Sequence, residues 1–491
     1  MRIRNTKTKS GSTAIQVVRS EQGKTIILKH LASGKTPEEI SHLREAAVTF
    51  LAQYSQQQSF FREESSFDPL FKNYRYLGTR SIFLYKTLFQ VFVHMGFSDL
   101  KDQLLLDLAL IRLVEPSSKR ESVKQLSCLF GINYDLTQLY KHLKIVADKK
   151  EQVEKILVDF AKNHLNFDFS FVLYDVPTLY FESFTADDLR KCGFSKDNKF
   201  NQPQIVVGLL VNRDGFPLSF DVFSGDKFEG LTIIPIITSL VSRYQIKNLT
   251  VVADAAMLSE KNIENIILAG LNYIVGARLG YLSDKEAERI CQKLNHTDSA
   301  SIRLLRKDKT LICDFSSKRY LKDKNDTEKQ IQKAKDVLEG KAVPKRYRFL
   351  TGGKNNFFLN ENLIDQSKLL WGIKGYCTNL DLPNSVIIDR YHDLWQVEKS
   401  FRMTKSDLLT RPIFHFKEKA IKAHLLICVM ALSVGKYLEI KSKKSLQTVL
   451  DELKKITDAR VVNIITGEET GWRAEISDEV KKILSDLEVA Y

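Results

Sequence analysis

The chain has 491 residues, of which 43% are hydrophobic, and its 74 Lys and Arg outnumber its 60 Asp and Glu to give a formal net charge of +14. This length predicts two to four domains rather than one compact core. Six scattered cysteines without CxxC spacing argue against a zinc site or a disulfide framework, and the basic charge favours either polyanionic partners or a plain solvated surface.

The first part of the chain predicts a short β segment followed by helices. Residues 13–30 alternate apolar and polar around a Glu-Gln-Gly turn, which is typical of a hairpin, so residues 1–35 are expected to form an N-terminal β-hairpin arm. From residue 36 to 166 the apolar residues recur every three or four positions, which predicts an all-α domain.

An α/β pattern begins at residue 167. Apolar runs predict strands at 167–176, 204–212 and 216–225, with a hairpin turn at Arg213, Asp214 and Gly215. A helix at 231–244, a strand at 249–254, a helix from Ser259 to Gly270 and a strand at 272–279 follow. We therefore expect an α/β domain in two parts, 167–279 and 371–440, separated by an insertion at 280–370 and followed by a tail at 441–491.

No membrane span is expected. The longest late apolar run, residues 423–435, is shorter than the roughly 20 residues that a spanning helix needs. The first residues also lack the apolar core of a signal peptide. Both observations favour a soluble, cytoplasmic protein.

Two predicted strands end in a carboxylate. Asp175 closes the run FVLYD and Asp254 closes LTVVAD, and the order of strands puts both near the middle of one sheet. Burying an unpaired charge costs several kcal/mol, and two neighbouring carboxylates repel each other. Because Mg²⁺ prefers oxygen ligands and cancels that repulsion, the pair predicts a divalent metal site.

A third carboxylate lies on a long helix predicted from about Asn384 to Leu408. One face of this helix, expected to be buried, carries Tyr391, Leu394, Trp395, Glu398, Arg402 and Lys405. Three acids could hold the two Mg²⁺ ions that clamp a phosphodiester during in-line attack, and Arg402 and Lys405 could bind the phosphate. The acids are widely separated in the sequence, so their spacing alone is a weak signal.

The blocks around all three acids resemble the insertion-sequence transposases with a DDE catalytic domain. The matching stretches are YDVPTLYFES, the segment from DDLRKCGF to DKFEG, VVADAAMLS and YHDLWQVEKSFRMTKSDLLTRPIFH, within residues 70–440. The resemblance implies catalytic and metal-binding roles for Asp175, Asp254 and Glu398. It also implies a ribonuclease H-like mixed sheet with flanking helices, interrupted by a mostly β insertion. The all-α region at 36–166, which precedes this domain, is expected to bind DNA because of its basic residues.

The subgroup signature of that family is Tyr, Arg, Glu and Lys at fixed spacing. Tyr391, Glu398 and Lys405 fit it, but Leu394 stands at the Arg position. Arg390 or Arg402 is expected to contact the phosphate instead, together with Tyr391 and Lys405.

The resemblance further implies the reaction and its partners. We expect cleavage at the terminal inverted repeats of an insertion sequence and transfer of the ends to target DNA, with two Mg²⁺ ions for which Mn²⁺ can substitute. The partners would be double-stranded DNA and a second copy in a synaptic homodimer, with no membrane, at the bacterial nucleoid. The alternatives are a stand-alone metal-dependent nuclease and a catalytically inactive DNA-binding protein.

Three DNA-contact hypotheses stay open beside plainer structural roles. The basic residues of the helical domain could belong to a recognition helix or simply pack: Arg75, Arg80, Lys86, Lys119 and Arg120. The loop that contains Asp188, Arg190, Lys191, Lys196 and Lys199 could contact DNA or be solvated. The aromatic residues Trp371, Phe357 and Phe358 of the insertion could stack on a flipped base or belong to the core.

Overall fold

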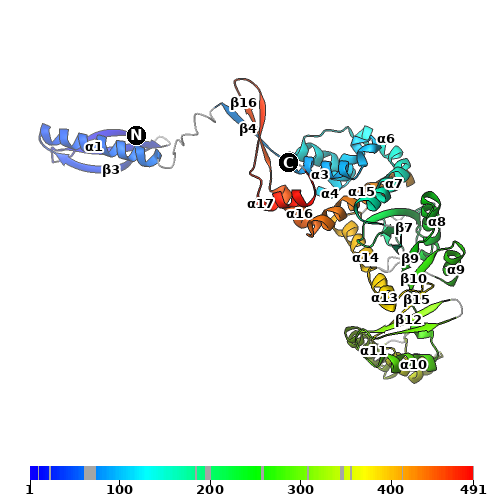
Figure 1. The fold of residues 1–491 in the computed structure, drawn as a ribbon. Coiled ribbons are helices and arrows are strands. Elements are labelled where there is room, and N and C mark those ends of the chain that lie inside the picture. The colour runs from blue at the N-terminus through cyan, green and yellow to red at the C-terminus, as the bar shows by residue number, and fades with distance from the viewer. Residues whose placement is uncertain are drawn as a thin grey trace. The chain divides into compact units, whose positions relative to one another are not determined.

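The computed structural model describes residues 1–8, 10–21, 24–59, 73–167, 169–182, 185–193, 201–255, 259–306, 309–342, 348–353, 356–411 and 413–489. The chain forms two compact units (Figure 1). The first comprises Met1–Gly78 and Ala459–Trp472, and the second comprises Thr79–Asp458 and Arg473–Tyr491.

A three-stranded antiparallel sheet opens the first unit. Its strands are β1 (Arg2–Lys7), β2 (Thr13–Glu21) and β3 (Lys24–Gly34), in that order. The predicted hairpin of β2 and β3 is confirmed, although Gln22 and Gly23 of its turn lie outside the described residues. The expected hairpin arm is therefore corrected to a three-stranded sheet, because β1 also pairs with β2.

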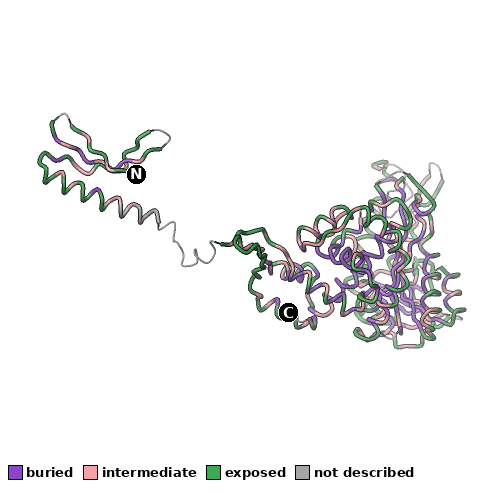
Figure 2. The backbone as a smooth tube through the Cα atoms, turned by 90° about the horizontal axis from the view of Figure 1, so that it is seen from above, coloured by how far each residue is buried: buried purple, intermediate pink, exposed green. Residues whose placement is uncertain are grey.

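Helix α1 (Pro37–Ser59) packs on one face of this sheet (Figures 1 and 2). Its start is fixed by Glu39, whose carboxylate accepts hydrogen bonds from the backbone N–H of Lys35 and Thr36. Ile15, Val17 and Ala47 are fully buried between sheet and helix. A sheet with one apolar face needs such a cover, so α1 belongs with the sheet and not, as expected, with the helical domain that follows.

A second small sheet joins distant parts of the chain. Its strand order is β17 (Glu469–Arg473), β16 (Asp458–Asn463) and β4 (Tyr74–Arg80). In the tail, helices α16 (Leu446–Lys454) and α17 (Asp478–Asp486) flank strand β16. The sequence did not predict β4, which interrupts the region expected to be all-α.

The second unit contains a helical layer built around one buried helix, α15 (Glu418–Ser442). This layer includes α3 (Ile82–His94), α4 (Gln103–Val114), α5 (Lys119–Gln125), α6 (Leu136–Val146) and α7 (Lys150–His164), with short turns η1 (Phe97–Leu100), η2 (Leu126–Phe130) and η3 (Ala147–Lys149). Among the described residues, α15 alone is long and apolar enough to cross a membrane, but 89% of its most apolar window is buried. It is the core of this helical layer.

A nine-stranded mixed sheet forms the α/β part, as the sequence predicts. The path runs β11 (Ser301–Leu305), β12 (Thr310–Phe315), β15 (Ile373–Thr378), β10 (Asn272–Ala277), β9 (Thr250–Ala253), β5 (Phe171–Asp175), β7 (Gln204–Val211) and β6 (Thr178–Tyr180), and β8 (Pro217–Ser224) pairs with β7. On one side lie α8 (Ile233–Tyr244) and α9 (Glu260–Leu268), with the turn η4 (Glu229–Leu231) before them. The later helices α13 (Asn384–His392) and α14 (Trp395–Arg402) cover the other side (Figure 1).

The insertion at 280–370 contains more helix than expected. It holds η5 (Leu279–Tyr281), α10 (Asp284–Leu294), α11 (Ser317–Leu338) and α12 (Glu361–Leu369), beside a hairpin of β13 (Leu350–Gly353) and β14 (Asn356–Leu359). Helix α11 has 22 residues, whereas β13 and β14 have 4 each. The expected mostly β insertion is thus corrected, and its strands β11 and β12 extend the large sheet.

The long helix expected at 384–408 is divided. Helix α13 (Asn384–His392) ends before α14 (Trp395–Arg402), and a π-helical turn η6 (Met403–Asp407) follows. The break at Asp393 and Leu394 changes which face of the second half is buried. Val397, Ser400 and Phe401 face the core, whereas Glu398 and Arg402 are exposed.

Candidate active site

The two strand-end aspartates lie side by side. Strands β5 and β9 are parallel, and Tyr174 pairs with Ala253, so Asp175 and Asp254 occupy the next register position. Neighbouring strands lie about 4.8 Å apart, and residues at one register position of parallel strands point to the same face. The Tyr174 hydroxyl on the opposite face lies 2.7 Å from Thr232 Oγ1, at the start of α8. Both aspartates therefore point to the face covered by α13 and α14.

Helix α14 is fixed over these strands by polar contacts. Ser400 Oγ donates a 2.7 Å hydrogen bond to the Gly215 carbonyl in the β7–β8 turn. Arg213 in the same turn forms an ion pair of 3.0 Å with Asp393. The turn predicted at residues 213–215 thus does more than join two strands, because it holds the helix that carries Glu398.

Replacing Gly215 with Ala is expected to destabilise the protein by about 2–4 kcal/mol. Its φ of +80° is unfavourable for other residues, and a Cβ would lie 2.7 Å from Ser400 Oγ. Gly270→Ala is the matched control, since Gly270 has a φ of +72° with no atom within 4 Å of a Cβ. The control should lose only about 1–2 kcal/mol in denaturant unfolding, and equal losses would contradict the role of the turn.

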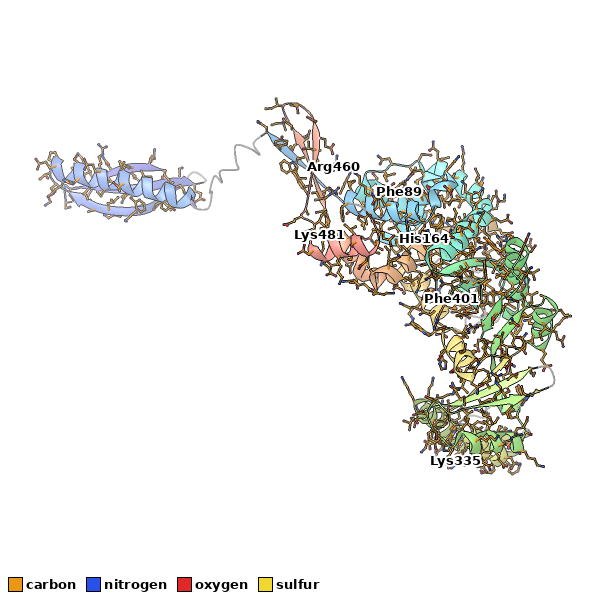
Figure 3. The ribbon with its side chains drawn as sticks, in the orientation of Figure 1. Phe89, His164, Lys335, Phe401, Arg460 and Lys481 are labelled. Carbon is orange, nitrogen blue, oxygen red and sulfur yellow. The ribbon has the colours of Figure 1, made fainter. Side chains whose placement is uncertain are left out.

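A cavity of about 470 Å³ separates the end of β5 from α14. One wall is formed by Asp175 and the three residues after it, and the opposite wall by Glu398, Phe401, Arg402, Lys405 and Ser406. Figure 3 labels Phe401 on α14. Glu398 is exposed to this cavity, so the expectation that it lies in a buried stripe is wrong. The charged side of α14 faces the cavity because its apolar side, with Val397 and Phe401, packs into the core.

Tyr391 lies above the strand next to Asp254. Gly276 of β10 follows Val275, which is paired with Ala253, and a Cβ on Gly276 would lie 2.6 Å from the Tyr391 hydroxyl. The absent side chain makes room for the tyrosine. Burial raises the pKa of Tyr391 to about 12, and the charges of Asp254 and Glu398 act in the same direction. Tyr391 therefore keeps its proton and can donate a hydrogen bond in this site.

The structure adds a cation that the sequence analysis missed, Lys374 of β15. Its Nζ lies 4.4 Å from the centre of the Tyr391 ring. Burial lowers the pKa of Lys374, and Arg319 acts in the same direction, whereas the carboxylates of Asp314, Asp254 and Glu398 oppose this shift. Lys374 is thus close enough to two of the three candidate acids to sense their charge. A lysine within the otherwise uncharged stretch GIKGYC was the only sequence signal.

The structure separates the two arginines proposed to replace the missing signature Arg. Arg402 lines the cavity with Glu398. Arg390 instead stacks on Phe171, with its guanidinium carbon 4.9 Å from the ring centre. Phe171 begins the strand that Asp175 ends, so Arg390 lies at the far end of β5 from the cavity. Leu394 packs partly into the core.

Carboxylate oxygens are the donors that Mg²⁺ prefers, so the chemistry of the candidate site fits a divalent cation. The geometry fits in part, since Asp175 and Asp254 are neighbours and Glu398 faces Asp175 across the cavity. Throughout the described part of the chain, however, no three Asp, Glu, His or Cys side chains form a group that could hold a metal ion. Repulsion between three like charges opposes their convergence unless a cation lies between them.

The other DNA-contact hypotheses receive less geometric support. Lys119 is buried, with Nζ 3.4 Å from His424 Nδ1, and Arg75 and Arg80 lie on strand β4, so the basic residues of the helical region do not share one helix. Arg190 is buried and pairs with Asp187 at 2.7 Å. Lys196 and Lys199 lie outside the described residues.

The aromatic candidates of the insertion differ in exposure. Trp371 donates a hydrogen bond of 3.1 Å from its indole to Thr327 and meets the Tyr320 ring edge-on. Phe358 is 61% exposed, while Phe357 is half-buried. Of the three, Phe358 alone combines an aromatic face with a largely exposed surface.

Comparison with known proteins assigns the chain to a family. The profile described as "Transposase DDE domain" matches residues 175–434, just over half of the chain, and this range includes all three acids. No curated protein matches. Among solved structures, the chain is similar to a piggyBac transposase synaptic complex with hairpin DNA, with 8% identity, a TM-score of 0.36, and coverage of 77% of this chain and 68% of that one. Because this family profile matches just over half of the chain, the protein belongs to the transposases with a DDE domain.

Proposed function

We propose that this transposase cuts DNA at the terminal inverted repeats of an insertion sequence and joins the ends to target DNA. The observation that carries the proposal is the arrangement at the 470 Å³ cavity, where Asp175, beside Asp254, faces Glu398, Arg402 and Lys405. Carboxylates that can hold divalent ions and cations that can bind the phosphate line the same cavity, as phosphodiester chemistry requires.

Each side chain has a distinct task in this proposal. Asp175 and Asp254, on rigid neighbouring strands, would hold one divalent ion, and Glu398 would complete the site of a second. Bound Mg²⁺, or Mn²⁺ in its place, would lower the pKa of an attacking water or 3′-hydroxyl and stabilise the leaving oxygen. Arg402 and Lys405 would bind the phosphate, and the Tyr391 hydroxyl would donate a hydrogen bond to it.

Lys374 extends this set of phosphate ligands. Its position over Tyr391 supports a role close to that expected of the signature Arg, which Leu394 replaces. The protein would use no covalent enzyme intermediate, because hydrolysis and transesterification both proceed by direct attack on phosphorus. Pairing of two DNA ends further implies a homodimer in the synaptic complex.

The test uses the full-length protein, a linear duplex that carries the DNA flanking its own gene, and a supercoiled target plasmid. With Mg²⁺ or Mn²⁺ we expect cleavage at the element ends and a covalent joint between end and plasmid, detected by sequencing the junctions. EDTA should abolish both products. A metal-dependent nuclease would cut the same duplex but give no junctions with the plasmid, even when a pre-cut 3′-hydroxyl end is supplied. An inactive DNA-binding protein would bind the duplex and slow its migration in a gel without cutting it.

A further inference from the structure

The N-terminal sheet has one face without a helix, which we call the free face. Side chains alternate between the two faces of a strand, and residues paired across strands share a face. Arg2 is paired with Val18 and Arg4 with Gln16, while Gln16 is paired with His30 of β3. These residues therefore lie on one face, and the 3.3 Å contact of Gln16 Nε2 with His30 Nδ1 agrees with that placement.

The opposite face is occupied by α1. Ile15 and Val17 alternate with Gln16 along β2, and both are fully buried in the core under the helix. Lys29, paired with Val17, places its Nζ 4.5 Å from the ring of Phe50 on α1. The two faces are thus assigned by independent contacts.

The segment formed by residues 1–35 carries a strongly positive net charge. Residues 1–35 contain eight Lys or Arg and a single acid, Glu21. Glu21 pairs with Arg19 at 2.8 Å, and both alternate with the free-face residues of β2, so they lie on the side of the helix. The strand positions assigned to the free face carry two arginines and no carboxylate, which favours a polyanionic partner.

The free-face residues are suited to reading base edges. Arginine donates two hydrogen bonds to guanine, glutamine pairs with adenine, and an apolar side chain contacts the thymine methyl group. Arg2, Arg4 and Gln16 supply the polar groups, and Ile27, on the same face, is 51% exposed. The outer strands of a three-stranded sheet lie about 10 Å apart, similar to the ~12 Å width of the major groove.

We propose that the free face of β1, β2 and β3 docks in the major groove of double-stranded DNA. The site that recognises the element's ends would then be this sheet rather than a recognition helix in the helical region. The inference rests on the proposed function only in taking DNA as the partner. It concerns a surface in the unit that does not contain the candidate active site.

The experiment compares two double variants of the full-length protein that remove equal charge from this unit. Arg2→Ser with Arg4→Ser changes the free face, and Lys24→Ser with Arg44→Ser changes exposed residues elsewhere in the unit, Arg44 on α1 and Lys24 on the helix side of the sheet. The probe is a duplex selected by the wild-type protein from a random-sequence pool. We expect the first variant to bind it at least about tenfold more weakly, with the control within about threefold. Methylation of guanine N7 should interfere with wild-type binding and not with residual binding by the first variant.

Three results would overturn the inference. Equal losses in both variants would mean that general charge is sufficient, and unchanged affinity of the first variant would exclude the free face. Loss of binding to anionic lipid vesicles, with DNA affinity intact, would assign the face to a membrane. Thermal unfolding midpoints equal to that of the wild type establish that each variant is folded. Because cleavage at the 470 Å³ cavity is measured separately, wild-type cleavage with an unaffected free-face variant refutes this inference alone.

Discussion

Replacing Asp254 with Asn is expected to lower the rate of DNA cleavage by about a thousandfold or more, while DNA affinity stays within a few-fold of the wild type. One electrostatic group at a reacting centre already contributes about 10²–10³ to a rate, and a ligand of the catalytic ion should contribute at least as much. Asp175→Asn and Glu398→Gln should behave in the same way. Single-turnover cleavage and an equilibrium binding assay in Ca²⁺ measure the two quantities.

The control for these substitutions is Asp381→Asn, which makes the same chemical change on a side chain exposed to solvent. It should cleave normally. The three active-site variants should also not act additively, since removing one ligand already disables the unit to which all three belong. Normal cleavage by Glu398→Gln would remove Glu398 from the site and leave the two strand aspartates as the only candidates.

The placement of Asp175 and Asp254 at the ends of neighbouring strands could be predicted from the sequence, because it follows from local patterns. Each ends an apolar run, and the order of strands and helices required the two strands to be near the centre of one sheet. The structure confirms that β5 and β9 are neighbours and parallel. The turn at Gly215 was also predictable, because an Arg-Asp-Gly sequence between two apolar runs is typical of a hairpin.

Glu398 shows where periodicity was insufficient. A helical projection from Tyr391 assigned Glu398 to a buried face, because it assumed one continuous helix. The break after His392 and the burial of Val397 and Phe401 in the core make Glu398 face the cavity instead. Which side of a helix is buried depends on its tertiary partners, and a single sequence does not specify them.

The pairing of distant strands was likewise beyond local reasoning. Strand β1 was not predicted, although its pairing with β2 creates the free face that we assign to DNA. Strand β15 adds to the sheet beside β10 after an insertion of about ninety residues, and brings Lys374 with it. The neighbours of Lys374 come from the end of β9 and from β12, α11, α13 and α14, so no spacing in the sequence reveals them.

Lys374→Gln should therefore lower the rate of cleavage by about 10–100-fold, with a smaller effect on DNA affinity. Lys374 is a cation near Asp254 and Glu398, and a phosphate entering this site is itself negative. Without the lysine, the negative charges of the acids and the phosphate would be less well balanced in the transition state. Lys374→Arg, which keeps the charge, should restore most of the rate.

The matched control is Lys335→Gln, which removes the same charge from the exposed surface of α11. It should cleave at the wild-type rate. A purely structural role of Lys374 as a cation over the Tyr391 ring predicts a different pattern, in which Lys374→Gln lowers the unfolding midpoint and Tyr391→Phe, which keeps the ring, leaves cleavage unchanged. If Lys374→Gln cleaves DNA normally, the positive charge at the site must come from Arg402 and Lys405, which line the cavity on α14 and η6.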